Sequence, residues 1–108
     1  MYVRMLKITV LLTRRSDLTH EEFAEYWENE HAPLVDDLPG IKRYTTAPVL
    51  KPEESQYDGV GEIYFETVEA MRKSFDNELG RQIREDEANF IDDIIILPAD
   101  ETVHIDRT

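Results

Sequence analysis

A histidine stands among aromatic residues on what the spacing predicts to be one face of a helix. Phe23, Trp27 and His31 follow one another at intervals of four residues, with Tyr26 beside them. Histidine is the side chain whose ordinary pKa lies closest to neutral pH, and it can both accept and donate a proton. His31 is therefore the candidate for a general acid or base in this chain.

The helix that carries His31 is expected to run from about residue 20 to Pro33. Thr19 and Glu22 have the spacing of a capping box, which satisfies backbone donors at the start of a helix. Proline disfavours helical geometry at the residue before it, so His31 should lie on or just past the last turn. There, hydrogen bonding of the ring to the last backbone carbonyls is the structural alternative to a catalytic role.

A carboxylate could orient the His31 ring. Glu30 is next to His31 in the sequence, but adjacent side chains on a helix diverge. A carboxylate farther along the chain, Asp58 or Asp86, is an equally good candidate.

Aromatic side chains could form a pocket for a flat, apolar ligand. Small-molecule sites are usually lined by such side chains, although an aromatic residue at helical or strand spacing fills a core more often than it touches a ligand. Two of the tyrosines rank above the other candidates because a buried hydroxyl needs a hydrogen-bond partner. The candidates are Tyr26, Trp27, Tyr44, Tyr64, Phe75 and Phe90, with Tyr44 and Tyr64 ranking first.

The composition excludes several kinds of chemistry and partner. The chain has no cysteine, and its three histidines are scattered, so neither a thiolate nucleophile nor a metal site is expected. It has no glycine-rich phosphate loop, and no cofactor is implied. The net charge of −12, from 24 acidic and 12 basic residues, argues against nucleic acid as a partner.

Length and hydropathy predict a single domain over residues 1–108 in the cytoplasm. The apolar run near the N-terminus is too short to span a membrane and lacks the cleavage pattern of a signal peptide. The diffuse acidic character resembles that of proteins from salt-loving cytoplasms. This halophilic hypothesis predicts that the fold loses stability as salt is removed, because self-repulsion is then less screened.

Turn signals and apolar patterning predict four strands and three helices. The first strand, from about Val3 to Leu12, is so apolar that both of its faces should be covered. A loop at 48–56 and a break at Gly80 are expected among the remaining elements. Those elements are helices at 20–33, 68–77 and 81–90 and strands at 41–47, 59–66 and 101–106. Val68 is expected on the inner side of the second of these helices.

This order of elements is typical of an α+β, ferredoxin-like split βαβ fold with a four-stranded antiparallel sheet. Helices cover one face of such a sheet, and the other face would present valine, isoleucine and leucine to water. A contiguous apolar patch of that kind usually marks an interface, so we expect a homodimer with the two sheets face to face.

Several segments resemble the EthD family of the dimeric α/β-barrel superfamily. They are EEFAEYW with EHAPLV in the first helix, LPGIKRY after it, and YDGVGEIYFET in the third strand. In this resemblance His31 matches the histidine of the family's HAP motif and Tyr26–Trp27 its YW pair. Tyr44 matches the aromatic residue after the LPG turn, and Asp58 with Gly59 matches the DG that opens the third strand. The segment 86–92 resembles one that in the family lies against the same pair of helices.

The resemblance implies a small enzyme that needs no cofactor and acts on an aromatic or other apolar small molecule. Decarboxylase, dehydratase or oxygenase-like chemistry, with His31 as acid or base, is what the family suggests. Two alternatives stay open: a non-catalytic module that binds a hydrophobic ligand, and a protein whose cavity is filled by its own aromatic side chains and which acts only through its dimer surface.

Overall fold

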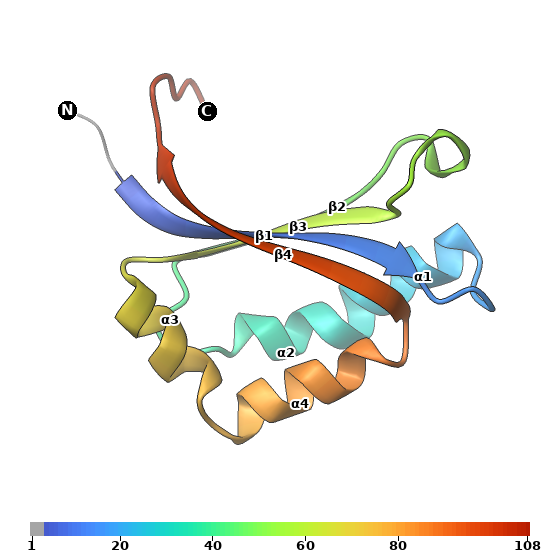
Figure 1. Cartoon of the computed structure of the whole chain (residues 1–108), viewed down its shortest axis with the longest axis horizontal. Coiled ribbons are helices and arrows are strands. Elements are labelled where there is room, and N and C mark those ends of the chain that lie inside the picture. Colours follow the sequence, from blue (N-terminus) through green and yellow to red (C-terminus); the bar gives the residue numbers. More distant parts are fainter. Residues whose placement is uncertain (1–3) are drawn as a thin grey trace.

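The computed structural model describes residues 4–108 and shows an antiparallel sheet with its α-helices on one side (Figure 1). The order of the strands in the sheet is β2-β3-β1-β4, and every neighbouring pair is antiparallel. The strands are β1 (Arg4–Arg14), β2 (Arg43–Pro48), β3 (Gly59–Phe65) and β4 (Ile91–Thr102). The predicted α+β ferredoxin-like arrangement is confirmed. Val3, the expected start of the first strand, lies outside the described residues.

The helical elements connect these strands, and all but η2, which lies in the loop between β2 and β3, are on the covered face of the sheet (Figure 1). Within residues 4–108, none of the helices is both long and apolar enough to cross a lipid bilayer. The helical elements are α1 (His20–Tyr26), the π-helical turn η1 (Trp27–His31), α2 (Ala32–Asp36), the short 3₁₀ turn η2 (Pro52–Glu54), α3 (Val68–Phe75) and α4 (Glu78–Glu87).

The first helix does not stop at Pro33, as the sequence suggested. Helical geometry continues through the π turn into α2, which ends at Asp36. In the π turn the backbone N–H of Ala32 donates to the carbonyl of Trp27, five residues back. The wider turn accommodates a proline that cannot donate to the ladder of an ordinary α-helix. His31 therefore lies within a helical segment, and the interpretation of His31 as a C-terminal cap is wrong.

The core lies between the sheet and the helices. Leu6, Ile8 and Leu12 of β1 point toward the helices and are buried together with Ile63 and Phe65 of β3. The intervening side chains of β1 point to the opposite face, since residues alternate along a strand. No helix of residues 4–108 covers that opposite face (Figure 1), so within one chain only one face of β1 is covered, and coverage of both faces, as expected from the sequence, depends on a second copy.

Of the two helices that follow β3, the first begins at Val68 as expected but ends earlier, and the second both begins and ends earlier than expected. Helix α3 ends at Phe75, and α4 begins at Glu78, after the side chain of Asn77 caps it by accepting from the N–H of Gly80. Gly80 therefore lies in the first turn of α4 and does not break the helix. Val68, expected on the inner side, is 46% exposed.

The last strand is longer and earlier than the expected strand at 101–106. The apolar run at residues 94–97 forms the middle of β4, which pairs only with β1. Pro98 stands opposite Ile8 within this pairing. A proline is tolerated there because β4 is an edge strand, where one side of the backbone needs no ladder partner.

Candidate functional site

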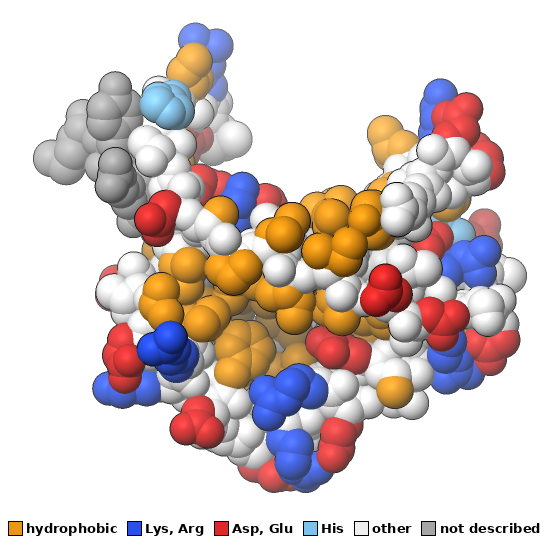
Figure 2. Space-filling model, in the orientation of Figure 1, with side chains coloured by type: hydrophobic (Ala, Val, Ile, Leu, Met, Phe, Trp, Pro, Cys, Tyr) orange, Lys and Arg blue, Asp and Glu red, His pale blue; other side chains and the backbone are white. Residues whose placement is uncertain are grey.

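A cavity of about 290 Å³ opens between the helical face of the sheet and the helices. Figure 2 shows a hollow lined by hydrophobic side chains, with basic and acidic side chains along its lower edge. Its walls are largely aliphatic and aromatic, as is usual for small-molecule sites. The lining residues are Ile8, Val10, Leu12, Trp27, His31, Val35, Tyr44, Ile63, Met71, Phe75, Ile83, Arg84, Glu87, Ile91, Ile94 and Ile96.

The lining residues differ in exposure, and this difference locates the mouth of the cavity. Trp27, His31 and Val35 are buried and form part of its floor. Ile96 on β4 and Arg84 on α4 are exposed. The cavity therefore opens between the edge strand of the sheet and α4.

A repeat of four residues positions the floor of the cavity. Phe23, Trp27, His31 and Val35 are all buried against the sheet. In a straight α-helix each step of four residues would rotate the side chain by about 40° beyond a full turn, and the set would drift off one face. The π turn between Trp27 and His31 widens the helix by one residue and offsets this drift. It is the local feature that turns both side chains toward the cavity.

Two glycines of β3 provide the space for the Trp27 ring. A Cβ atom built on Gly59 would lie 2.5 Å from Cζ3 of Trp27, and one built on Gly61 would lie 3.1 Å from its Cζ2. Both glycines lie on the helical face of the strand, opposite Leu12 and Val10 of β1. The indole therefore packs directly on the backbone of β3.

His31 is held by a carboxylate from α4. Its Nδ1 lies 2.9 Å from Oδ2 of Asp86, one of the three carboxylates considered from the sequence. The hydroxyl of Tyr26 donates to the other oxygen of Asp86 at 2.6 Å, and the amide of Asn89 donates to it at 3.0 Å. The ring of Phe90 packs on His31 with 4.8 Å between the ring centroids. Because Nδ1 faces Asp86, Nε2 is the ring nitrogen available to a ligand in the cavity.

Burial and this carboxylate influence the pKa of His31 in opposite directions. Burial disfavours the imidazolium and lowers the pKa of His31 below its ordinary value, outweighing the hydrogen bond to Asp86, which raises it. Burial also raises the pKa of Asp86, but hydrogen bonds from Tyr26, Asn89 and His31 together hold it below its ordinary value. At neutral pH the pair is therefore a neutral imidazole beside an ionised carboxylate, with Nε2 free to accept a proton.

Tyr44 forms a second polar group on the cavity wall. Its hydroxyl oxygen accepts a hydrogen bond of 3.2 Å from Nε1 of Trp27. Burial raises the pKa of Tyr44 to about 12, so the hydroxyl keeps its proton at neutral pH. That proton remains available for donation to an oxygen of a bound ligand.

Two charged residues of α4 that the sequence reasoning missed also line the cavity. Glu87 is half-buried, and burial raises its pKa above the ordinary value, while Arg84 opposes that rise. Arg84 is exposed at the mouth. Glu87 stands four residues after the buried Ile83, and this spacing was a signal that its side chain shares the inner face of the helix.

The aromatic candidates divide between the cavity and its surroundings. Trp27, Tyr44 and Phe75 line the cavity together with His31. Tyr26 and Phe90 do not line it, but they support His31, the first through Asp86 and the second by direct ring packing.

Tyr64 lies on the opposite face of the sheet. Its hydroxyl donates to Glu101 of β4 at 2.7 Å, and the guanidinium of Arg43 stacks over its ring. Its neighbours on that face include Lys7, which forms an ion pair with Glu101. Tyr64 therefore cannot contact a ligand in the cavity of its own chain.

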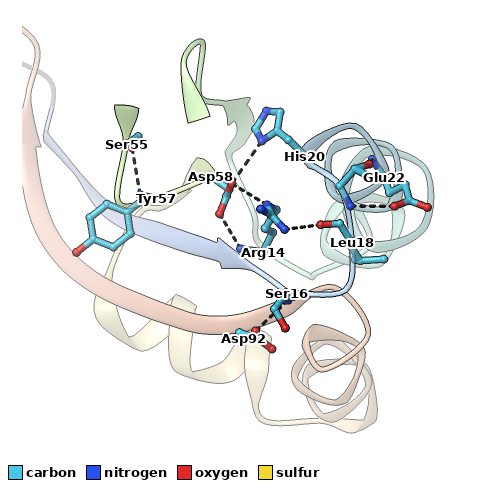
Figure 3. A network of polar contacts seen from close by, with 10 residues as sticks. Arg14, Ser16, Leu18, His20, Glu22, Ser55, Tyr57, Asp58 and Asp92 are labelled. Carbon is cyan, nitrogen blue, oxygen red and sulfur yellow. Dashed lines mark hydrogen bonds and ion pairs between the residues drawn. The ribbon is translucent and has the colours of Figure 1, made fainter. Parts of the chain in front are cut away.

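Asp58 belongs to a separate polar network at the end of β1, shown in Figure 3. It accepts a hydrogen bond of 2.9 Å from the backbone N–H of Arg14, whose side chain in turn donates to the carbonyl of Leu18. Nδ1 of His20 lies 3.5 Å from the Asp58 carboxylate (Figure 3). These contacts tie the start of α1 to the loop before β3, and Asp58 does not line the cavity.

Residues 4–108 contain no cluster of three or more histidine, aspartate or glutamate side chains placed to hold a metal ion. The polar groups of the cavity are therefore those already described, and what they can do together is transfer a proton and hydrogen-bond an oxygen within an apolar enclosure.

Comparison with known proteins gives one family match and several structural neighbours. The model of the EthD domain matches residues 15–94. An EthD (ethyl tert-butyl ether) family protein from Bacillus halodurans is 23% identical, covers 90% of this chain and 98% of its own, and superposes with a TM-score of 0.77. No curated protein matches at a significant level of sequence similarity.

Two further neighbours share the fold at lower identity. A dimeric ferredoxin-like protein from Thermobifida fusca is 16% identical, covers 89% of this chain and 90% of its own, and has a TM-score of 0.72. A hydroxynitrile lyase from Passiflora edulis is 16% identical, covers 96% of this chain and 95% of its own, and has a TM-score of 0.71.

Proposed function

The chain belongs to the EthD family, and from that premise we propose that it is a cofactor-independent enzyme that acts on an aromatic or other apolar small molecule. The ligand occupies the cavity between sheet and helices, and His31 acts there as the general acid or base. The observation that carries this proposal is the position of His31, which lines an apolar cavity while its Nδ1 is held by Asp86.

The geometry supports a reaction that begins with removal of a proton. Nε2 of the neutral His31 accepts a proton from the substrate, and Asp86 stabilises the imidazolium that forms. The Tyr44 hydroxyl donates a hydrogen bond to the substrate oxygen on which negative charge develops. His31 then returns the proton to the product or the leaving group. Dehydration and isomerisation both follow this course. Decarboxylation follows it where His31 takes the proton of a substrate hydroxyl and, as CO2 leaves, returns it to the carbon that carried the carboxylate.

A lyase on a similar fold supports this class of chemistry. The structural neighbour from Passiflora edulis is named as a hydroxynitrile lyase. At 16% identity the likeness shows the fold alone, so it indicates what such a scaffold can accommodate and does not identify a substrate for this chain.

The second candidate is a non-catalytic module that binds a hydrophobic ligand. The largely aliphatic lining of the cavity, with isoleucines from three strands and α4, favours retention of an apolar molecule whether or not it is converted. Such a module would tolerate glutamine in place of His31, whereas the enzyme would not.

The open face of the sheet supports assembly as a homodimer. Leu11, Val60, Ile95 and Leu97 lie on that face by strand alternation, and Leu97 is 48% exposed. Similar proteins from Thermobifida fusca and Bacteroides fragilis are described as dimeric with a ferredoxin-like fold. Two copies packed through these faces would cover the apolar side chains.

The test of the proposed function separates binding from turnover. A panel of hydroxylated aromatic compounds and aromatic acids is screened by the fluorescence of Trp27, the only tryptophan in the chain, and compounds that bind are assayed for conversion by mass spectrometry. The variants are His31→Gln and Asp86→Asn. His20→Gln is the control, because it removes a histidine outside the cavity.

We expect His31→Gln to bind the ligand with little change but to lose turnover by about a hundredfold or more, the usual contribution of a positioned acid or base. Asp86→Asn should lose less, because Nε2 remains in the cavity. Full turnover by His31→Gln would overturn the catalytic role of His31. Tight binding without turnover in every protein would favour the binding module.

A further inference from the structure

The position of Arg84 at the mouth of the cavity points to a subsite for a negatively charged group, and we infer that the ligand is an organic acid with an apolar body. The body lies in the cavity, and its carboxylate or other oxyanion binds the guanidinium of Arg84. This inference rests on the proposed ligand cavity and adds the chemical class of the molecule that fills it.

Arg84 lies where two recesses meet. It lines the cavity, and it also lines the neighbouring groove between α3 and α4. Met71 and Phe75 of α3 are shared by the same two recesses. A ligand whose apolar part fills the cavity would therefore present the end that leaves the mouth directly to Arg84.

The guanidinium of Arg84 is available to a ligand. On the same helix, Arg81 forms ion pairs with Glu78 and Glu85. The side chain of Arg84, by contrast, forms no ion pair or hydrogen bond with any residue in the part of the chain from 4 to 108 that the structure describes, although its charge lowers the pKa of Glu87 through space. A free guanidinium beside an apolar surface is suited to bidentate recognition of a carboxylate.

The local charge favours an anion, against the trend of the whole molecule. The chain carries 24 acidic and 12 basic residues. The groove beside the cavity, however, is lined by Arg72, Lys73 and Arg84 against only Glu69 and Asp76. Along this groove basic side chains therefore outnumber acidic ones, whereas the chain as a whole has twice as many acidic as basic residues, and an anion meets less repulsion here than over most of the surface.

Glu87 would orient such a ligand. It lies one helical turn after Arg84 and also lines the cavity. An ionised Glu87 repels a second negative charge, so the acid group of the ligand should face Arg84, and an uncharged hydroxyl should face Glu87. Removing the charge of Glu87 should consequently strengthen the binding of an acid.

The experiment compares an acid with its neutral amide. Phenylpropanoate and phenylpropanamide have the same apolar body and differ in charge, and binding is measured by calorimetry and by Trp27 fluorescence. The variants are Arg84→Gln, Arg84→Lys and Glu87→Gln. Arg81→Gln is the matched control, because it makes the same change of charge on the same helix at a residue that does not line the cavity.

We expect Arg84→Gln to weaken binding of the acid by about fivefold, the size expected of a partly exposed charge pair, and to leave the amide unchanged. Arg84→Lys should retain part of the preference, and Glu87→Gln should raise the affinity for the acid. Added salt should weaken binding of the acid only.

Three results would overturn the inference. Equal losses for acid and amide in Arg84→Gln would assign Arg84 a packing role, and an unchanged preference for the acid would place the anion site elsewhere. In both cases the proposed cavity stands, since the amide still binds. If neither compound perturbs Trp27 in the wild-type protein, the cavity is not a ligand site for aromatic molecules, and the proposed function fails together with the anion site.

Discussion

At the scale of a single residue, the chemistry of this protein depends on how burial changes His31. The ring is 5% exposed, lies against Phe90, and has one carboxylate partner. Burial opposes the charged form, and Asp86 supports it. Because burial has the larger influence, the neutral base is the form present near neutral pH, which is the form that proton abstraction requires.

This balance predicts that His31 titrates below its ordinary pKa of 6.5. The pKa is measured by NMR titration of the three histidine rings, with His31→Gln for assignment. A group with a depressed pKa in the folded protein contributes stability above its unfolded pKa and loses it as pH falls. The free energy of unfolding should therefore decrease as pH falls below 6.5. The decrease should be shallower in His31→Gln, and a His31 that titrates above 6.5 would contradict the argument.

At the scale of the elements, the site depends on the match between a widened helix and a strand that has glycine where the helix packs on it. The π turn keeps Trp27 and His31 on the same side of the helix. Gly59 and Gly61 let β3 approach the indole ring. The π turn alone would not position the indole, because a strand with larger side chains at these two positions would displace Trp27 from the sheet.

Gly59→Ala tests this contact. The added methyl group would lie 2.5 Å from the Trp27 ring and 3.2 Å from Phe23, so we expect a loss of about 1–3 kcal/mol in the free energy of unfolding and a change in Trp27 emission.

The control for this variant is Gly40→Ala. Gly40 has a φ of 78° and no atom within 4 Å of a built Cβ, so alanine there should cost about 1–2 kcal/mol through the backbone alone and leave Trp27 emission unchanged. Unchanged emission in Gly59→Ala would show that Trp27 can move away without consequence.

At the scale of the whole molecule, the open face of the sheet is the proposed dimer interface. In Figure 1 the sheet is twisted, and the C-terminal end of β4 and the loop between β2 and β3 rise at opposite ends of this face. The face combines apolar side chains with ion pairs between Lys7 and the carboxylates of Glu62 and Glu101. A surface of this kind is expected to pair with a second copy of itself.

If the chain forms the proposed homodimer, Leu97→Glu should convert it into a monomer, because the substitution places a charge in an apolar contact. The molar mass is measured by light scattering during size-exclusion chromatography. Val68→Glu is the matched control, since Val68 is 46% exposed against 48% for Leu97 but lies on α3 away from the open face. Dimers of unchanged stability in Leu97→Glu would show that this face is not the interface.

The charge of the whole chain predicts a salt dependence. With a net charge of −12, repulsion among carboxylates should exceed the attraction in the few ion pairs, so the midpoint of thermal unfolding should rise as potassium chloride is added. A midpoint that falls with salt would show that the ion pairs have the larger effect. This measurement also tests the halophilic hypothesis.

The sequence was sufficient to predict the order of the elements, the antiparallel ferredoxin-like sheet and the family. Alternation in strands and a capping box at Thr19 are local patterns, and local patterns identify the type of an element. The choice of His31, Trp27, Tyr44 and Phe75 as site candidates came from the same patterns and from the family resemblance, and the structure brings these four to one cavity.

Only the tertiary structure decided which candidates face that cavity and which partner holds His31. The continuation of the helix through Pro33 depends on a π turn that is stabilised by packing against the sheet, and no propensity for the single residues encodes it. Tyr64 and Asp58 lie elsewhere because the register of the strands, set by long-range pairing, determines the face and the end of the sheet on which each side chain stands. Asp86 and Arg84 reach the site for the same reason: the packing of α4 beside η1 and α2 joins residues that are more than fifty positions apart in the sequence.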